Sequence, residues 1–352
     1  MKIGISCHAL KHSGGIERYA MDLVRGLSDL GIKPVFFAKK FDTSITEFAL
    51  VDPCKISTRW LPQKLRDNFF SYRLQKKKVQ YGVDKLISCN RVSSSDIAIC
   101  GGTHIGFLRA MGQTAGLADH LQTRLEKKQY ASAQHIIAHS RLMVDELRAD
   151  YGISEEKISL AYPPADTTRF TVVSAEKRCA LREKFQFPKD KVVFLFPSSS
   201  HKRKGFPLLA EFFKKTNLPV ILAVVGRPIK SDSPNIRYLG FRKDIEECYQ
   251  AADFTILASH YEPFGLVGIE SVLCGTPVVM AENIGCLEIL SDSAKLTFNS
   301  RDPASLAAAV ATAAGNGLRR DNRLQTPAEH ITSDIEIESH IKIILALCAR
   351  IA

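Results

Sequence analysis

The chain has 352 residues, 45% of them hydrophobic, and its 48 Lys and Arg residues against 37 Asp and Glu give a formal net charge of +11. This length favours two domains with separate cores over one large core, and the charge favours anionic partners: nucleotides, acidic glycans, anionic lipid surfaces or nucleic acid. The nine cysteines form no C-x-x-C pair, and no apolar run reaches the roughly 18 residues of a membrane helix. Disulfides, a zinc site and a membrane span are therefore not predicted. Because the opening MKIGISCHAL is too short and too soon polar for a signal peptide, we expect a cytoplasmic protein.

The chain begins with a strand, a glycine pair and a helix. Residues 3–7 predict a short strand, and Gly14 and Gly15 precede a helix whose apolar residues keep helical spacing as far as Leu30. A second strand at 32–38 completes a βαβ unit. A glycine pair before a helix lets the backbone approach a phosphate or sugar closely, although a plain tight turn fits the local sequence equally well.

The segment 59–80 is basic and rich in aromatic residues. Its one acid is Asp67, and its basic residues are Arg59, Lys64, Arg66, Arg73, Lys76, Lys77 and Lys78. An anionic membrane surface would attract this charge while the aromatic side chains enter the interface, and single-stranded nucleic acid needs a similar surface. An amphipathic domain helix with a solvated basic face is the third interpretation.

Two further strands are predicted at 84–89 and 96–100, and the second ends in Cys100-Gly101-Gly102-Thr103-His104. In an open parallel sheet, ligands bind outside the carboxyl ends of the strands. His104 is therefore a candidate to donate a hydrogen bond to a hydroxyl or a phosphate, although a lone histidine is more often structural or exposed.

Pro163 and Pro164, followed by polar residues, mark a boundary between two domains. We expect an N-terminal domain over residues 1–164 and a C-terminal domain over 165–336, with a last helix at about 337–352 that crosses back to the first domain. Strands and helices alternate in both halves, which predicts an α/β architecture of doubly wound parallel sheets.

The second domain begins with a strand at 192–196, which leads into the cationic run Lys202-Arg203-Lys204 and then Gly205. Three cations after a strand can be a solvated turn. They can also bind a diphosphate, with Arg203 as a bidentate clamp and Lys204 as a point charge on the leaving phosphate.

A buried strand at 254–257 leads through Pro263-Phe264-Gly265 into a helix that begins near Leu266. Glu262 lies in the turn, and Glu270 lies among apolar neighbours on the helix. The amides after Gly265 would offer a phosphate unpaired N–H groups, while the two carboxylates suit the hydroxyls at the two ends of a sugar nucleotide. The alternative is a solvated Glu262 and a Glu270 that satisfies a local hydrogen bond.

The segment EPFGLVGIE, followed by CGTPVV, resembles the E-x7-E signature of retaining glycosyltransferases with the GT-B fold, in particular glycosyltransferase family 4. The resemblance extends over essentially the whole chain. It implies two Rossmann-like domains that face an interdomain cleft, with the acceptor bound by the first domain and the donor by the second. It also implies that Glu262 binds hydroxyls of the donor sugar and Glu270 binds the ribose, near Phe264, Gly265 and Leu266.

By the same resemblance, Gly14 and Gly15 face the donor diphosphate, and Arg203 and Lys204 belong to an R-K-G element that neutralises it. The chain departs from the family at Ser198-Ser199, where many relatives carry Gly-Arg or Gly-Ser. This departure weakens the case for a second phosphate-binding arginine.

The resemblance further implies that His104 contacts the donor sugar or the acceptor hydroxyl, and that Phe241 and Arg242 line the pocket of the base. Gly285-Cys286 replaces a more usual glycine pair, so a close approach of this backbone to the sugar is not expected.

We therefore predict a retaining glycosyltransferase that moves a sugar from a nucleotide-diphosphate sugar, with UDP as the expected nucleotide, to a glycan or lipid-linked glycan in lipopolysaccharide core or surface polysaccharide biosynthesis. His104, Arg203, Lys204 and Glu262 are the predicted catalytic residues. Because no D-x-D motif occurs, cations and helix dipoles are expected to replace a metal, and no cofactor is predicted.

The expected partners are the donor, the acceptor and an anionic membrane surface at 59–80, which would hold the protein peripherally at the inner face of the plasma membrane; no nucleic acid partner is expected. Two other functions remain open. One is a GT-B-like sugar-nucleotide epimerase or sugar-phosphate synthase, and the other is a noncatalytic module that binds nucleotide sugars or nucleic acid.

Overall fold

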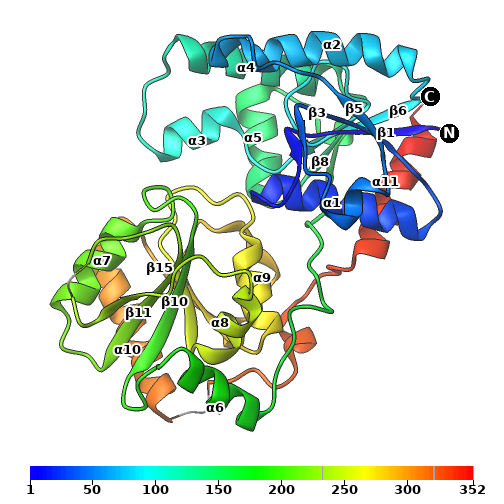
Figure 1. Ribbon diagram of the computed structural model, residues 1–352. Helices are drawn as coiled ribbons and strands as arrows, with labels where there is room; N and C mark the ends of the chain where they lie inside the picture. The colour runs from blue at the N-terminus through cyan, green and yellow to red at the C-terminus, as the bar shows by residue number, and fades with distance from the viewer. Residues whose placement is uncertain (232, 320–321, 352) are drawn as a thin grey trace. The chain divides into compact units, whose positions relative to one another are not determined.

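The computed structural model describes residues 1–231, 233–319 and 322–351 (Figure 1). The chain divides into two compact units, one made of Met1–Pro164 with Asp334–Ala352 and the other of Ala165–Ser333. The division falls at the predicted boundary after Pro164, and the last helix belongs to the first unit. Each unit is an α/β fold built around one parallel sheet, as predicted.

The first unit has a seven-stranded sheet in the order β5-β3-β1-β6-β7-β8-β9, and all of its strand pairs are parallel. Its strands are β1 (Ile3–Ser6), β3 (Val35–Ala38), β5 (Asp52–Lys55), β6 (Lys85–Ser88), β7 (Ile97–Cys100), β8 (His135–Ala138) and β9 (Ile158–Leu160), and β2 (Ala9–Leu10) pairs separately with β4 (Lys40–Phe41). Its helices are α1 (Gly15–Asp29), α2 (Arg66–Gln80), α3 (His104–Ala110), α4 (Leu117–Ser132), α5 (Arg141–Tyr151) and α11 (Ile337–Arg350), with 3-10 turns at Thr46–Phe48, Gln63–Leu65 and Glu155–Lys157.

Helices cover both faces of this sheet (Figure 1). Successive residues of a strand point to opposite faces. Phe36 of β3 accordingly packs in a core that includes α1 and α11, whereas its neighbours Val35 and Phe37 pack in a second core with α2. The sheet is therefore doubly wound, as the alternation of strands and helices predicts.

The second unit has a six-stranded, all-parallel sheet in the order β12-β11-β10-β13-β14-β15. Its strands are β10 (Val192–Ser198), β11 (Val220–Gly226), β12 (Ile236–Tyr238), β13 (Phe254–Leu257), β14 (Val278–Ala281) and β15 (Lys295–Phe298). Its helices are α6 (Ala175–Lys184), α7 (Phe206–Lys215), α8 (Ile245–Ala251), α9 (Leu266–Leu273) and α10 (Pro303–Arg319), with 3-10 turns at Gly285–Ile289, Asp292–Ala294 and Pro327–His330. The central strands β10 and β13 are buried along their whole length, as expected for parallel strands covered on both faces.

The basic segment 59–80 becomes a helix only from Arg66 onward. Phe70 and Leu74 of α2 are fully buried in the core, whereas the Trp60 side chain before the helix is 69% exposed and packs edge-on against Phe69. The inner face of α2 thus packs in the core, as in an ordinary domain helix. Membrane docking of the outer face of α2 stays a prediction. Among the described residues, no helix is both long enough and apolar enough to cross a bilayer.

Candidate active site

The candidate donor site lies at the edge of the second sheet where the carboxyl ends of its strands meet. Two connections cross the middle of this edge: the loop from β10 to α7 and the turn from β13 to α9. Because β10 and β13 are neighbours in the sheet, residues of the two connections lie side by side although they are far apart in the sequence. The loop carries Arg203 and Lys204, and the turn carries Glu262.

Gly205 allows the two connections to pack closely. Its φ is +75°, and a Cβ atom there would lie 1.9 Å from the carbonyl oxygen of Ala258, so only glycine fits. The backbone N–H of His260 donates to the carbonyl oxygen of Arg203 at 2.9 Å. These contacts hold the cationic loop against the turn of Glu262.

Arg203 pairs with the acid predicted to bind the donor sugar. Its Nη1 donates to Glu262 Oε2 at 2.8 Å and to the Tyr261 carbonyl oxygen, also at 2.8 Å. Both bonds use Nη1, and no acceptor among the described residues bonds Nε or Nη2. Arg203 can therefore orient Glu262 and still present two nitrogens, Nε and Nη2, to a phosphate.

Lys204 is buried, with a relative exposure of 7%, and its Nζ donates to the Pro197 carbonyl oxygen at 3.0 Å. Burial lowers the pKa of the Lys204 ammonium, and the adjacent Arg203 lowers it further, while Glu262 and Glu270 oppose the shift. The structure thus brings all four of these predicted site residues together. An anionic ligand would complete the environment of this cation.

Glu262 is held by its own backbone as well as by Arg203. It forms a parallel bridge with Ile284, and its carbonyl oxygen accepts from the N–H of Gly285 at 3.2 Å. A Cβ atom on Gly285 would lie 2.0 Å from the Pro263 carbonyl oxygen. The segment at Gly285-Cys286 therefore packs against the turn itself, which explains why its first residue is glycine.

Gly265 ends the turn with φ +88° and is the N-cap of α9, which begins at Leu266. Phe264 is buried, with 5% exposure, so this residue could reach a donor only through its backbone. The first amides of an α-helix have no acceptor within the helix and form its positive end. The amides of Leu266 and its neighbour thus suit a phosphate, as the sequence predicts.

Glu270 lies in the second turn of α9 and is 5% exposed. Its Oε2 accepts from the hydroxyl of Tyr249, a fully buried residue of α8, at 2.9 Å. The sequence did not single out Tyr249, because in its helix it fits the apolar pattern. This contact fixes one oxygen of the carboxylate predicted to bind the ribose.

Phe241 and Arg242 follow β12 at the same edge of the sheet. The Phe241 side chain is 78% exposed. Arg242 donates to Asp244 through Nε and Nη2 and stacks over the Phe185 ring, with its Cζ 5.1 Å from the centroid. Phe241 is therefore open to a base, whereas Arg242 has a structural ion pair that it would have to share.

In the first unit, Gly14 and Gly15 lie at the start of α1. Gly14 is the N-cap, and its N–H donates to the Glu17 carboxylate at 3.2 Å. A Cβ atom on Gly15 would meet nothing within 4 Å, and neither glycine has a positive φ. The fold of this unit therefore does not require Gly15, which leaves room there for a ligand.

His104 begins α3 after the carboxyl end of β7, at the predicted edge, but it is buried and partnered. Its Nε2 lies 2.9 Å from Asp119 Oδ1, and its backbone N–H donates to Glu126 Oε2 at 2.8 Å. Neither acid was predicted, because both fall on the charged helix α4, whose pattern reads as solvated. His104 can act only through the nitrogen that Asp119 does not hold.

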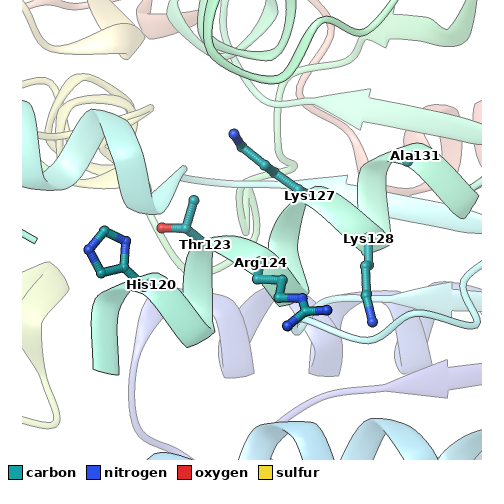
Figure 2. A pocket seen from close by; sticks show the side chains of 6 residues that line it. All are labelled: His120, Thr123, Arg124, Lys127, Lys128 and Ala131. Carbon is teal, nitrogen blue, oxygen red and sulfur yellow. The ribbon is translucent and has the colours of Figure 1, made fainter. Parts of the chain in front are cut away.

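A shallow groove of about 460 Å³ runs along α4. Figure 2 shows the side chains that line it, and the basic ones are His120, Arg124, Lys127 and Lys128. The buried face of the same helix carries Glu126, which also accepts from Arg91 Nε at 2.8 Å. One face of α4 thus fixes α3, and the other offers positive charge to an anionic molecule.

Comparisons with known proteins show the family of the chain. The model of glycosyl transferases group 1 matches residues 177–329, and the model of Glycosyltransferase Family 4 matches residues 13–169. A Burkholderia thailandensis protein named "Probable transglycosylase" is 51% identical over 306 residues, which are 87% of this chain and 84% of that protein. The chain belongs to glycosyltransferase family 4.

Other relatives of this glycosyltransferase are more distant. The mannosylfructose-phosphate synthase of Agrobacterium fabrum is 30% identical over 186 residues, which are 46% of this chain and 40% of that enzyme. Among solved structures, WaaG, a glycosyltransferase involved in lipopolysaccharide biosynthesis, superposes with a TM-score of 0.84 at 16% identity over 97% of this chain and 99% of that one. Anabaena HepE in complex with UDP-glucose gives 0.76 at 16% identity over 98% and 99%. These likenesses confirm the predicted GT-B fold.

The arrangement at the edge of the second sheet has the parts that transfer from a phosphate leaving group needs. The cations Arg203 and Lys204 and the first amides of α9 are groups that can stabilise negative charge, and the carboxylates of Glu262 and Glu270 are groups that can accept from hydroxyls. Among the described residues, no three His, Cys, Asp or Glu side chains gather as a metal site would require. The charged groups that such a transfer would use thus lie together on the second unit.

Proposed function

We propose that this transferase moves a sugar from a nucleotide-diphosphate sugar, with UDP as the nucleotide, to a glycan or lipid-linked glycan acceptor, and that the anomeric configuration is retained. The observation that carries the proposal is the cluster of Arg203, Lys204, Glu262 and Glu270 at one edge of one sheet. HepE, which shares the fold, was solved with UDP-glucose, and this supports the choice of nucleotide.

Catalysis is proposed to rest on stabilisation of the negative charge that develops during the reaction. Breaking the bond between the sugar and the diphosphate builds up negative charge on the leaving phosphate, and Lys204 and the α9 amides are proposed to stabilise that charge. Glu262, oriented by Arg203, binds hydroxyls of the sugar, and Glu270 binds the ribose. Transfer is proposed to need no metal, so a chelator such as EDTA should leave the rate unchanged.

The acceptor is proposed to belong to surface polysaccharide biosynthesis, such as the lipopolysaccharide core. WaaG, which shares the fold, is involved in lipopolysaccharide biosynthesis, and the basic groove on α4 suits a phosphorylated or acidic glycan. His104, whose Nε2 lies against Asp119 of α4, would contact the acceptor hydroxyl or the donor sugar through its other ring nitrogen.

The test is turnover with a panel of labelled nucleotide sugars and purified glycan acceptors, with release of nucleoside diphosphate and glycan product measured separately. Transfer with release of the diphosphate supports the proposal, and Lys204→Ala should lower it at least 100-fold, since a charge that stabilises the transition state is worth about 3 kcal/mol. Binding of the donor without turnover by the wild-type protein would support a noncatalytic module instead.

A second candidate is synthesis of a free sugar phosphate, because the mannosylfructose-phosphate synthase is a relative and a sucrose-phosphate synthase shares the fold. Sugar phosphates therefore belong in the acceptor panel. A transglycosylase, as the Burkholderia relative is named, would take its sugar from a glycan and release no nucleotide. Donor glycans without nucleotide should give no product with this enzyme if our proposal holds.

We also propose that the outer face of α2 and the residues before it dock on an anionic membrane, at the inner face of the plasma membrane. The exposed side chains Arg59, Trp60, Lys64 and Tyr72 combine charge with aromatic surface, and Trp60 has little contact beyond Phe69. Lys78 is less suited, since it pairs with Asp96.

Co-sedimentation with vesicles of phosphatidylglycerol and phosphatidylcholine tests the docking. Charge reversal at Arg59 and Lys64 should release the protein from anionic vesicles at 0.1 M salt, while Lys127→Glu with Lys128→Glu on α4 should leave binding unchanged. If the α4 variant is released from the anionic vesicles and the variant at Arg59 and Lys64 stays bound, α2 does not form the membrane-binding face.

A further inference from the structure

The turn that follows β11 is fastened to the phosphate loop predicted after β10. β11 ends at Gly226, where φ is +112° and a Cβ atom would lie 2.4 Å from the carbonyl oxygen of Ser198. The next N–H, that of Arg227, donates to the same carbonyl oxygen at 2.9 Å. The backbone of Arg227 is therefore in direct contact with the last residue of β10.

His201 of the phosphate loop holds this turn from the other side. Its Nδ1 lies 2.9 Å from Ser198 Oγ, and its Nε2 lies 3.2 Å from the carbonyl oxygens of Arg227 and Pro228. Because carbonyl oxygens only accept, Nε2 carries the hydrogen. His201 thus fixes the backbone of Arg227 beside the loop of Arg203 and Lys204.

The Arg227 side chain is exposed and makes no ion pair with the described residues. Of the three cations in the phosphate loop, Arg203 is balanced by Glu262 and Lys204 is buried against a carbonyl oxygen, whereas Lys202 is exposed. A nucleoside diphosphate brings at least two negative charges. Like Lys202, Arg227 carries a charge that no acid of the described residues offsets, and unlike a lysine it can bind two phosphate oxygens at once.

The order of strands places Arg227 on the path of a nucleotide. β11 lies between β10, which leads to the phosphate loop, and β12, which leads to the exposed ring of Phe241. A nucleotide whose diphosphate lies over β10 and whose base lies over the end of β12 must cross the end of β11. The ribose-linked phosphate is the phosphate nearer the base, so it lies on the side of the phosphate loop that faces the end of β11.

We propose that Arg227 binds the phosphate next to the ribose of the nucleoside diphosphate, as a second guanidinium beside Arg203. The inference rests on the proposed function, because it takes the nucleotide donor from there. A guanidinium can bond two phosphate oxygens at once, which suits an exposed residue that has a fixed backbone and a mobile side chain.

Calorimetric titration of the purified full chain with UDP, ADP and GDP, and with the corresponding nucleosides, tests the inference. Arg227→Gln should weaken the best-bound diphosphate about tenfold, as expected for a charged hydrogen bond, and should leave the affinity for its nucleoside unchanged. The matched control is Arg301→Gln, an exposed arginine that follows β15 at the far end of the same edge and should have no effect.

Three results would overturn the inference: unchanged diphosphate affinity in Arg227→Gln, an equal loss in Arg301→Gln, or an equal loss for the nucleoside, which would place the contact on the base or ribose. If the wild-type protein binds no nucleoside diphosphate, the proposed function itself fails, and the inference falls with it. A circular dichroism spectrum matching wild type ensures that the variant is folded.

Discussion

Lys204 is a cation that the ligand-free protein holds at a cost. Its ammonium is buried, donates a single hydrogen bond to the described residues, and has its pKa lowered chiefly by desolvation. Replacing a buried charge by an apolar side chain of similar size is often neutral or stabilising. The Lys204 ammonium thus lowers the stability of the fold but supplies a positive charge where a diphosphate is expected to bind.

We therefore expect Lys204→Met to raise the thermal midpoint by a few degrees while it lowers sugar transfer at least 100-fold. Differential scanning calorimetry and the transfer assay measure the two effects on one preparation. Lys202→Met, at an exposed neighbour, is the control and should change neither quantity. A Lys204→Met protein that is markedly less stable would mean that the ammonium is needed by the fold.

The loop between β10 and α7 depends on one glycine, and this gives a prediction at the level of an element. Gly205→Ala introduces a methyl group 1.9 Å from a backbone oxygen at a residue with φ +75°, so the loop must move or the helix must shift. Strain of this kind costs about 2 kcal/mol or more. Urea unfolding should show this loss, together with weaker nucleotide binding.

Gly15→Ala provides the comparison, because a Cβ atom there meets nothing within 4 Å. Its free energy of unfolding should equal or slightly exceed that of the wild type, since alanine favours a helix more than glycine does. If both alanine variants unfold at the same urea concentration, the close packing at Gly205 does not limit stability.

The elements and the donor turn were predictable because local patterns specify them. Apolar runs followed by glycines predicted the strands and the turns at Gly205 and Gly265, and both glycines have the positive φ that such turns need. Side-chain partners were not predictable, because they join distant segments: Tyr249 to Glu270, and Asp119 to His104. The sequence therefore predicted which residues lie together at this edge of the second sheet, but it could not show which of their polar groups already have partners.

At the scale of the whole molecule, the last helix belongs to the first unit. Gly26 of α1 packs closely against Ile337 and Ile341 of α11, and the Tyr19 hydroxyl lies 2.7 Å from His340 Nε2. The His139 ring, which is 4.6 Å from that of Tyr19, is also buried, and its Nε2 has no partner among the described residues. Two neutral histidines thus line the contact that attaches α11.

This pair predicts how stability depends on pH. Burial lowers the pKa of His139 to about 3 and that of His340 to about 4, from 6.5 in an unfolded chain. Below pH 6.5 the unfolded chain takes up protons that the folded protein does not, so stability falls as the pH falls, by up to about 1.4 kcal/mol per pH unit for each ring. Urea unfolding between pH 7 and pH 4.5 measures the slope.

His340→Gln should make that slope smaller by the contribution of one proton, whatever it does to stability at pH 7. Tyr19→Phe, which removes the hydroxyl and leaves both rings, should keep the full slope. An unchanged slope in His340→Gln would show that the loss of stability in acid has another source.

The return of α11 also has a consequence for biosynthesis. A ribosome delivers residues 1–164 long before residues 337–350, so the newly made first half must wait, with the apolar side of α1 uncovered, while the second half is synthesised and folds. The second unit, although it is synthesised later, can thus reach its native state before the first unit does. Chaperone demand during translation should then depend on how fast the ribosome crosses residues 165–333.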